Sequence, residues 1–366
     1  MSGFGSLLRP LVVNGVKLPN RLVFPPTVTN YGDVDGEVTD RLIRYYQEIA
    51  RNSVGLTVVG ATAVAKAGNL FPLCTRIDDD RYLEGFSRLF SVIQEAGSVP
   101  AVQLAHAGRQ TSQRMTGEQP VAPSAIPCPV WKDEPHELAI KEIEEIEDAF
   151  AEGVKRSKAA GAAMVELHGA HGYLIHQFFS PLSNRREDGY GGSLENRVRF
   201  ALNILHKCRA QVGSDFPLIC RISAEEFMEG GLTLQESQEI AILLAENGVD
   251  IISVSAGVAA SRPQRDKFMK EGRFWELAGA IKKALPQTPV IAVGKIIDLA
   301  TAEQVMEEQG VELIAICRAL IADPELVAKS IEGQSEEIVR CIECGECTNS
   351  LVKDEMGMVC SVNPNL

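Results

Sequence analysis

The stretch LICRISAEEFMEGGLTLQESQEIAILLAENGVDIISV, Leu218–Val254, reads as one strand–helix–strand unit. Its two ends, Leu218–Ile222 and Ile251–Val254, are short apolar runs rich in β-branched residues. Between them, Leu234–Glu246 carries apolar residues three or four positions apart, which is the spacing of an amphipathic helix. Alternation of this kind predicts an α/β protein with a parallel sheet.

The same alternation runs along the rest of the chain. Strands are predicted at Leu22–Pro25, Leu56–Ala61, Ala101–Leu104, Met164–Leu167, Leu218–Ile222, Ile251–Val254, Val290–Val293 and Leu313–Ile316. Helices are predicted at Thr39–Arg51, Asp80–Glu95, Glu142–Ala159, Leu194–Gln211, Leu234–Glu246, Arg273–Lys283 and Thr301–Glu308. Eight such units indicate one TIM (β/α)8 barrel, residues 1–332, followed by a short cysteine-rich extension, residues 333–366. A doubly wound sheet is disfavoured, because its first strand would lead into G-x-G-x-x-G, and here it leads into Pro25-Pro26-Thr27.

Composition narrows the classes of partner. The 366 residues carry a formal net charge of −13, which argues against nucleic acid and against a membrane surface as partners. The sequence has neither a long apolar window nor a signal-peptide pattern in Met1–Leu22, so we expect a cytoplasmic protein. Five of the nine cysteines are scattered singly, as expected for reduced thiols.

Polar residues follow several predicted strands, and in a TIM barrel these positions meet at one mouth. They are Gln103, His168, His171, Arg221, Gly294, Lys295 and Arg318. The loops after strands seven and eight are the usual phosphate site of this fold, so Gly294 and the backbone of Cys317 and Arg318 predict a phosphorylated cofactor. Solvated surface charge is the alternative for Lys295 and Arg318.

His168-Gly-Ala-His171-Gly-Tyr173 is an H-x-x-H-x-Y motif. Two imidazole N–H groups can hold a substrate oxygen, and a tyrosine can deliver a proton, which suits reduction of an activated C=C bond. A zinc site and an ordinary hydrogen-bonded pair are the alternatives. An aldolase or isomerase would need a Schiff-base lysine, for which only Lys295 is placed, and a non-enzymatic assembly subunit would leave Tyr173 and Arg221 unexplained.

Four cysteines gather near the C-terminus. Cys341, Cys344, Cys347 and Cys360 are spaced C-x2-C-x2-C-x12-C. This spacing is typical of an iron–sulfur cluster, here expected to be [4Fe–4S], while a zinc ribbon or unligated thiols remain open.

The chain resembles the Old Yellow Enzyme family of FMN-dependent oxidoreductases. The resemblance is carried by HGAHGYLIHQFFSPLSNRREDGYGGSLENRVRF (His168–Phe200), NRLVFPPTVTNY (Asn20–Tyr31), VQLAHAGR (Val102–Arg109) and RALIADPEL (Arg318–Leu326). It implies that FMN is bound by Pro26, Thr27, Val28, Gly60, Gln103, Arg221, Gly294, Lys295, Cys317 and Arg318. It also implies that His168 and His171 bind the substrate carbonyl or the flavin edge, that Tyr173 protonates the substrate opposite flavin N5, and that the protein is a homo-oligomer.

The cysteine tail points to the longer relatives, which are dienoyl-CoA reductases, enoate reductases and trimethylamine dehydrogenases. The cysteine spacing is most similar to the last, but that branch attaches FMN to a cysteine near Val28, and no cysteine precedes Cys74 here. We therefore expect ene reduction, with electrons relayed through the cluster from an electron-transfer protein or an FAD/NAD(P)H-binding subunit. The alternatives are oxidation of a small amine, and direct reduction by NAD(P)H with a structural cluster.

The sequence departs from the family pattern at two of these positions. Val28 stands where a cysteine or threonine tunes the flavin, so the flavin potential could be shifted. Cys317 stands where the phosphate loop usually has glycine, which should constrain the backbone there while leaving its N–H donor in place.

Overall fold

A computed structural model describes residues 4–270, 273–353 and 357–366. Eight parallel strands close into a barrel, in which neighbours along the chain are also neighbours in space. The strands are β3 (Leu22–Phe24), β4 (Leu56–Ala63), β5 (Val99–Ala105), β8 (Met164–Gly169), β9 (Leu218–Ser223), β10 (Ile251–Ser255), β11 (Val290–Val293) and β12 (Leu313–Ala315). β12 pairs with β3 and closes the ring, so the predicted TIM barrel is confirmed.

The barrel is filled by side chains from every strand. Its interior cluster consists mainly of Val23, Leu56, Val58, Ala101, Met164, Ile219, Ile251, Ile291, Leu313 and Ala315. Side chains alternate along a strand, so the neighbouring residues face outward and pack under the helices. A hairpin that the sequence reading missed, β1 (Leu11–Val13) and β2 (Val16–Leu18), adds Val13 and Leu18 to the interior cluster.

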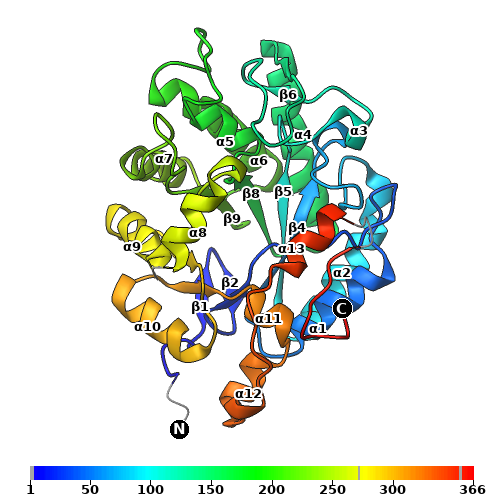
Figure 1. Ribbon diagram of the computed structural model, residues 1–366, viewed down its shortest axis with the longest axis vertical. Helices are drawn as coiled ribbons and strands as arrows, with labels where there is room; N and C mark the ends of the chain where they lie inside the picture. The colour runs from blue at the N-terminus through cyan, green and yellow to red at the C-terminus, as the bar shows by residue number, and fades with distance from the viewer. Residues whose placement is uncertain (1–3, 271–272, 354–356) are drawn as a thin grey trace.

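Helices surround the barrel (Figure 1). The long ones are α1 (Asp40–Ala50), α2 (Leu83–Glu95), α4 (Ile140–Ala159), α6 (Leu194–Val212), α7 (Leu234–Glu246), α9 (Phe274–Ala284) and α10 (Leu299–Gln309). These match the seven predicted helices to within a few residues at each end. The Thr39, Ser193, Thr233 and Asp298 side chains each accept a backbone N–H of the first turn, and this capping defines where α1, α6, α7 and α10 begin.

Short elements occupy the connections. They are α3 (Gln113–Thr116), α5 (Leu174–Phe179), α8 (Arg262–Lys270), α11 (Arg318–Ala322), α12 (Leu326–Glu332), α13 (Glu346–Lys353), the strands β6 (Val121–Ala122) and β7 (His136–Glu137), and four 3-10 turns, Lys66–Gly68, Asp80–Tyr82, Ala259–Ser261 and Ser335–Glu337. Within the described ranges no helix is long and apolar enough to cross a membrane.

The C-terminal segment lies against the barrel. The Tyr31 hydroxyl donates to the Met358 carbonyl at 2.5 Å, and the Met358 N–H donates to the Thr29 carbonyl at 2.7 Å. Asn363 donates to the Ile321 carbonyl at 2.9 Å. These bonds tie the tail to the loop after β3 and to α11. The expected boundary between domains 1–332 and 333–366 stays a prediction, and residues 1–3, 271–272 and 354–356 of those domains lie outside the described residues.

Candidate active site

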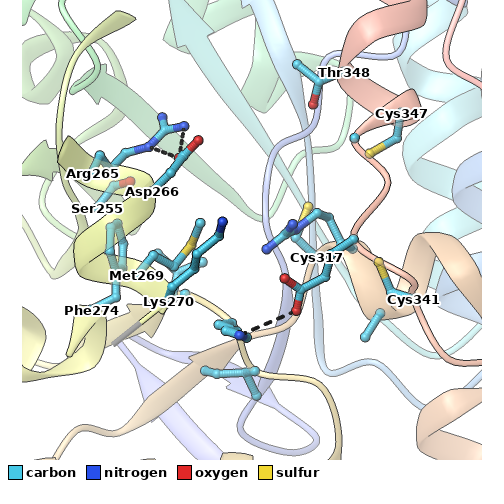
Figure 2. A pocket seen from close by; sticks show the side chains of 18 of the residues that line it. Ser255, Arg265, Asp266, Met269, Lys270, Phe274, Cys317, Cys341, Cys347 and Thr348 are labelled. Atoms are coloured by element: carbon cyan, nitrogen blue, oxygen red, sulfur yellow. Dashed lines mark hydrogen bonds and ion pairs between the residues drawn. The ribbon is translucent and has the colours of Figure 1, made fainter. Parts of the chain in front are cut away.

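A large pocket at the barrel mouth has a volume of about 570 Å³, within the usual range of small-molecule sites. It lies between α8 and the C-terminal segment (Figure 2). Of the predicted residues, it is lined by Arg221, Gly294, Lys295, Cys317, Arg318, Cys341, Cys344 and Cys347. One pocket therefore joins the expected phosphate loops to three of the four tail cysteines.

The two loops predicted to bind a phosphate differ in their backbone conformation. Gly294 follows β11 with φ +120°, and a methyl group on it would overlap the Phe274 ring, so only glycine fits. Cys317 has a negative φ of −106°, outside the left-handed region that favours glycine. The cysteine that replaces the usual glycine therefore does not have to adopt a left-handed conformation. Lys295 forms an ion pair with Glu343 of the tail at 3.6 Å.

Strand register brings together the polar residues expected at the ring edge of the cofactor. Gln103 of β5 is the register partner of Glu166 of β8, and its side-chain amide donates to that carboxylate at 2.6 Å. The Gln103 carbonyl oxygen is left to accept a hydrogen bond from a ligand N–H. A side chain at Gly60, where φ is +148°, would crowd Gln103. Glu166 was missed by sequence reasoning, although its place near the end of a predicted strand was a usable signal.

Arg221 is buried beside this pair. It is 8% exposed, and its Nε has no hydrogen-bond partner among the described residues. Burial raises the pKa of Glu166, and the nearby Arg221 cation lowers it in part. A buried guanidinium with an unpaired nitrogen is costly unless a ligand completes it. The unpaired Arg221 Nε, the open Gln103 carbonyl and the two glycine positions all fit FMN.

The loop after β3 borders the same region. The Thr27 hydroxyl lies 3.4 Å from the Cys317 sulfur and donates to the Pro25 carbonyl at 3.1 Å. Val28 packs in a small cluster with Tyr173. The structure thus places Thr27 beside Cys317 and Val28 beside the motif tyrosine.

His168, His171 and Tyr173 lie together at the end of β8. The rings of His168 and Tyr173 are 4.8 Å apart and those of His168 and His171 are 5.1 Å apart, each pair edge to face. Burial, together with the Arg221 cation, holds the pKa of both histidines well below the usual range, so both are neutral at pH 7. Burial raises the pKa of Tyr173, which keeps its phenol protonated and able to act as an acid.

The histidine nitrogens are engaged with protein groups. His171 Nδ1 lies 3.3 Å from His168 Nε2, and His171 Nε2 lies 2.6 Å from the Ser255 hydroxyl. This arrangement differs from the expected pair of imidazole N–H groups that are both open to a substrate. Ser255, the last residue of β10, was not among the predicted site residues.

The tail cysteines are only partly assembled. All four are free thiols, and Cys341, Cys344 and Cys347 line the large pocket. The Cys344 sulfur lies 3.3 Å from the hydroxyl of Ser361, which follows Cys360, so the fourth cysteine is carried back toward the second. However, the described residues contain no group of three or more His, Cys, Asp or Glu placed to hold a metal ion. The donor chemistry fits an iron–sulfur cluster, and the four-thiolate shell remains a prediction.

Comparison with known proteins identifies the family of this chain. The model of the NADH:flavin oxidoreductase / NADH oxidase family matches residues 6–337. An NADH oxidase of Thermoanaerobacter brockii is 42% identical over 370 residues, which cover 100% of this chain and 56% of that protein. An NADPH dehydrogenase of Geobacillus sp. (strain WCH70) is 38% identical over 319 residues, covering 87% of this chain and 91% of the relative.

A solved structure of 2-naphthoyl-CoA reductase with 2-naphthoyl-CoA superposes with a TM-score of 0.94 at 30% identity, covering 99% of this chain and 57% of that one. The chain spans about half the length of the first curated relatives, 56% and 51%. The resemblance to Old Yellow Enzyme is confirmed: this chain belongs to the NADH:flavin oxidoreductase / NADH oxidase family.

Proposed function

We propose that this chain is an FMN-dependent reductase of an activated C=C bond, of the enoyl-CoA, enoate or enone type. The observation that carries the proposal is the partly buried, protonated Tyr173, whose ring packs against that of His168, while Arg221 stands as register partner of His168 on the next strand. A proton donor and a buried cation thus both neighbour His168, and Arg221 lines the pocket of the phosphate loops. Bound there, FMN supplies the hydride.

The residues around Arg221 bind and orient the cofactor. Arg221, with its unpaired Nε, would hold the cofactor ring, and its positive charge would stabilise negative charge on the reduced ring. Gln103, whose amide orientation is set by Glu166, accepts a ring N–H. Pro26, Thr27, Val28 and Gly60 approach the ring with their backbone, and Gly294, Lys295, Cys317 and Arg318 take the phosphate.

Tyr173 transfers its proton to the substrate carbon opposite the hydride. Its pKa is raised by burial, so the phenol carries a proton throughout the neutral range. The 2-naphthoyl-CoA reductase structure, at 30% identity, supports an acyl thioester among the candidate substrates. The same cavity wall carries Arg262, Arg265 and Lys270, which suit an anionic substrate.

We propose further that Cys341, Cys344, Cys347 and Cys360 hold a [4Fe–4S] cluster. Three of them line the pocket of the phosphate loops, which would place the metal beside the cofactor. Such a cluster supplies one-electron transfer, which connects the protein to an electron-transfer protein or to an FAD/NAD(P)H-binding subunit. Relatives named NADPH dehydrogenase support NAD(P)H as a direct donor instead.

An anaerobic titration tests the reaction. The protein, reduced by dithionite, is mixed with cyclohex-2-enone, with crotonate and with crotonyl-CoA, and flavin absorbance is followed. Reoxidation by one of these acceptors is the expected result. Bleaching of the oxidised protein by a small amine, without reoxidation by any alkene, would instead support the amine-oxidising alternative, for which histamine dehydrogenase from Rhizobium sp. 4-9 is a structural neighbour at 27% identity and TM-score 0.86.

The electron donor is tested separately. Reduction of the flavin by ferredoxin and by NADH is compared in the wild type and in Cys344→Ala. The relay predicts that loss of iron abolishes reduction by ferredoxin. Rapid reduction by NADH that is unchanged in Cys344→Ala would show that the cluster is not on the electron path.

A further inference from the structure

The side chain of Gln177, in the short helix α5, is completely buried. Its amide nitrogen donates to the Gly172 carbonyl at 2.7 Å and to the Ala107 carbonyl at 3.0 Å. Its amide oxygen accepts the Arg109 N–H at 3.2 Å. One side chain therefore joins the loop after β5 to the turn of the H-x-x-H-x-Y motif.

The orientation of this amide is fixed by its partners. A carbonyl can only accept and a backbone N–H can only donate, so the amide nitrogen must face Gly172 and Ala107. The oxygen must then face Arg109, and both N–H groups of the amide are used. A methyl group on Gly108, where φ is +60°, would overlap the Gln177 oxygen, so the loop can approach the amide this closely only with glycine.

Gln177 also holds both peptide groups that flank Tyr173. In the peptide before Tyr173, the Gly172 carbonyl accepts from the Gln177 side chain. The N–H of that peptide donates to the Ala170 carbonyl at 3.2 Å. In the peptide after Tyr173, the carbonyl accepts the Gln177 N–H at 2.8 Å, and the N–H donates to the His106 carbonyl at 2.9 Å. Because peptide groups are planar, these bonds fix the direction in which the Tyr173 side chain leaves the backbone.

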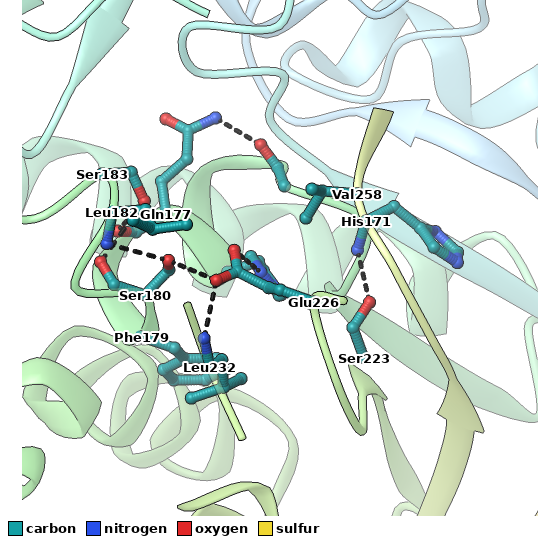
Figure 3. Close-up of polar contacts among 12 residues, drawn as sticks. His171, Gln177, Phe179, Ser180, Leu182, Ser183, Ser223, Glu226, Leu232 and Val258 are labelled. Carbon is teal, nitrogen blue, oxygen red and sulfur yellow. Dashed lines mark hydrogen bonds and ion pairs between the residues drawn. The ribbon is translucent and has the colours of Figure 1, made fainter. Parts of the chain in front are cut away.

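The turn depends on such support because its backbone is unusual. His171 has φ +60° and Gly172 has φ +82°, two left-handed residues in succession. A histidine adopts this conformation at a cost, and such a residue persists where its surroundings hold it. One end of the turn is tied to β9, since the His171 N–H donates to the Ser223 hydroxyl at 2.9 Å (Figure 3). Gln177 holds the other end, next to Tyr173.

We propose that Gln177 is a positioning residue for the proton donor, because its side chain holds the turn in the geometry that brings the Tyr173 phenol to the alkene carbon. Ala107, whose carbonyl Gln177 also binds, packs in the same small cluster as Tyr173. The amide thus joins the turn that carries the tyrosine to the surface against which the tyrosine packs. This inference rests on the proposed function and adds a residue that acts through Tyr173.

A double-mutant cycle tests whether Gln177 acts through Tyr173. Gln177→Met keeps the length of the side chain and removes its amide. The rate at which cyclohex-2-enone reoxidises the dithionite-reduced protein, the enone rate, should fall about 10- to 100-fold, because a small misplacement of a reacting group costs that much. In the Tyr173→Phe background the same substitution should change the remaining enone rate by less than about 2-fold, because no phenol is left to misplace. An equal fall in both backgrounds would overturn the inference.

Gln177→Glu gives a second readout, the dependence on pH. A protonated carboxyl at this position can still donate one hydrogen bond to a carbonyl, whereas an ionised one would face two carbonyl oxygens without a hydrogen. The enone rate of Gln177→Glu, relative to wild type at the same pH, should therefore exceed that of Gln177→Met at low pH and approach it as the pH rises. A Gln177→Glu protein as slow as Gln177→Met at every pH would contradict the proposed role of the donor.

Asn184 provides a matched control for loss of a buried amide. Its nitrogen donates to the Phe178 and Tyr190 carbonyls at 2.8 and 2.7 Å, and its oxygen accepts the Arg186 N–H at 3.2 Å. Asn184→Leu should lose unfolding free energy, as Gln177→Met does, and keep the enone rate and FMN content of the wild type. An equal loss of enone rate in Asn184→Leu would overturn the inference and leave the proposed function standing. A wild-type protein that no activated alkene reoxidises would instead overturn the proposed function.

Discussion

The two walls of the large cavity are built differently. The barrel wall presents side chains at strand ends, where register sets the neighbours: Gln103 beside Glu166, and His168 beside Arg221. The tail wall presents Cys341, Cys344 and Cys347, of which only Cys347 lies on a helix, the short α13. A partly exposed ion pair between Lys295 and Glu343 links the tail wall to the barrel wall. Exposed ion pairs of this kind contribute little to stability.

This difference indicates which of the two walls is organised before any ligand binds. The barrel half is held by the parallel ladder and the packed core, so its side chains are in place in the protein alone. The cysteine half has its donors near one another without a ligand shell, as expected where metal binding and local folding are coupled. Changes in the barrel half should therefore affect chemistry and stability, and changes in the tail should affect metal content.

The largest effect is expected from Tyr173→Phe. Loss of the phenol should slow reoxidation by the alkene about 10²- to 10⁴-fold, because general acid catalysis typically contributes that much. Reduction of the flavin by dithionite should be unchanged. Stopped-flow measurement of each half-reaction checks this, with Tyr190→Phe, whose hydroxyl bonds Glu147 away from the cavity, as the control. Equal rates in Tyr173→Phe and wild type would remove Tyr173 from the mechanism.

Gly294→Ala should come next. Its left-handed φ costs an alanine about 1–2 kcal/mol, and overlap with Phe274 adds about 1–3 kcal/mol to the loss of unfolding free energy. FMN content should fall in parallel. Gly333→Ala is the matched control, because Gly333 has φ +79° but open space around it, and should lose only the first part. Equal losses in urea unfolding would show that the phosphate loop is not tightly packed.

A smaller, pH-dependent effect is expected at His106. Burial lowers the pKa of His106 from about 6.5 to about 4 in the folded protein. Between these values the unfolded chain binds a proton that the folded chain does not, so this part of the stability is complete above pH 6.5 and is lost as the pH falls toward 4. The loss should reach about 3 kcal/mol. His106→Gln should flatten the profile of unfolding free energy against pH, whereas His206→Gln, at an exposed site, should not.

The smallest effect on the barrel is expected from Cys344→Ala. Cys344 is exposed, so the unfolding free energy of the barrel should change by less than about 0.5 kcal/mol, while bound iron and acid-labile sulfide are lost. Cys208→Ala should do the reverse, because Cys208 is a buried residue of α6: iron is kept and about 1 kcal/mol of unfolding free energy is lost. Iron analysis and urea unfolding of both variants check this prediction. If each variant lost both bound iron and unfolding free energy, the division between the two walls would be contradicted.

Much of the site could be predicted from the ends of strands. Arg221, Gly294 and His168 follow or close apolar runs, and the fold brings such positions to one mouth. Glu166 and Ser255 obey the same rule but were missed, since a carboxylate or a serine in a buried run carries no pattern by itself. Their roles depend on the residue across the ladder, which register decides.

The sequence by itself determined the eight strands, the glycine after the seventh of them and the cysteine spacing, because short apolar runs, obligatory glycines and ligand types are local properties of a chain. Only the tertiary structure decided that Gln103 meets Glu166, that His171 meets Ser255, and that the cysteine tail lies beside the loops after β11 and β12. Those contacts join residues far apart in the chain, and closure of the barrel sets the distances between them.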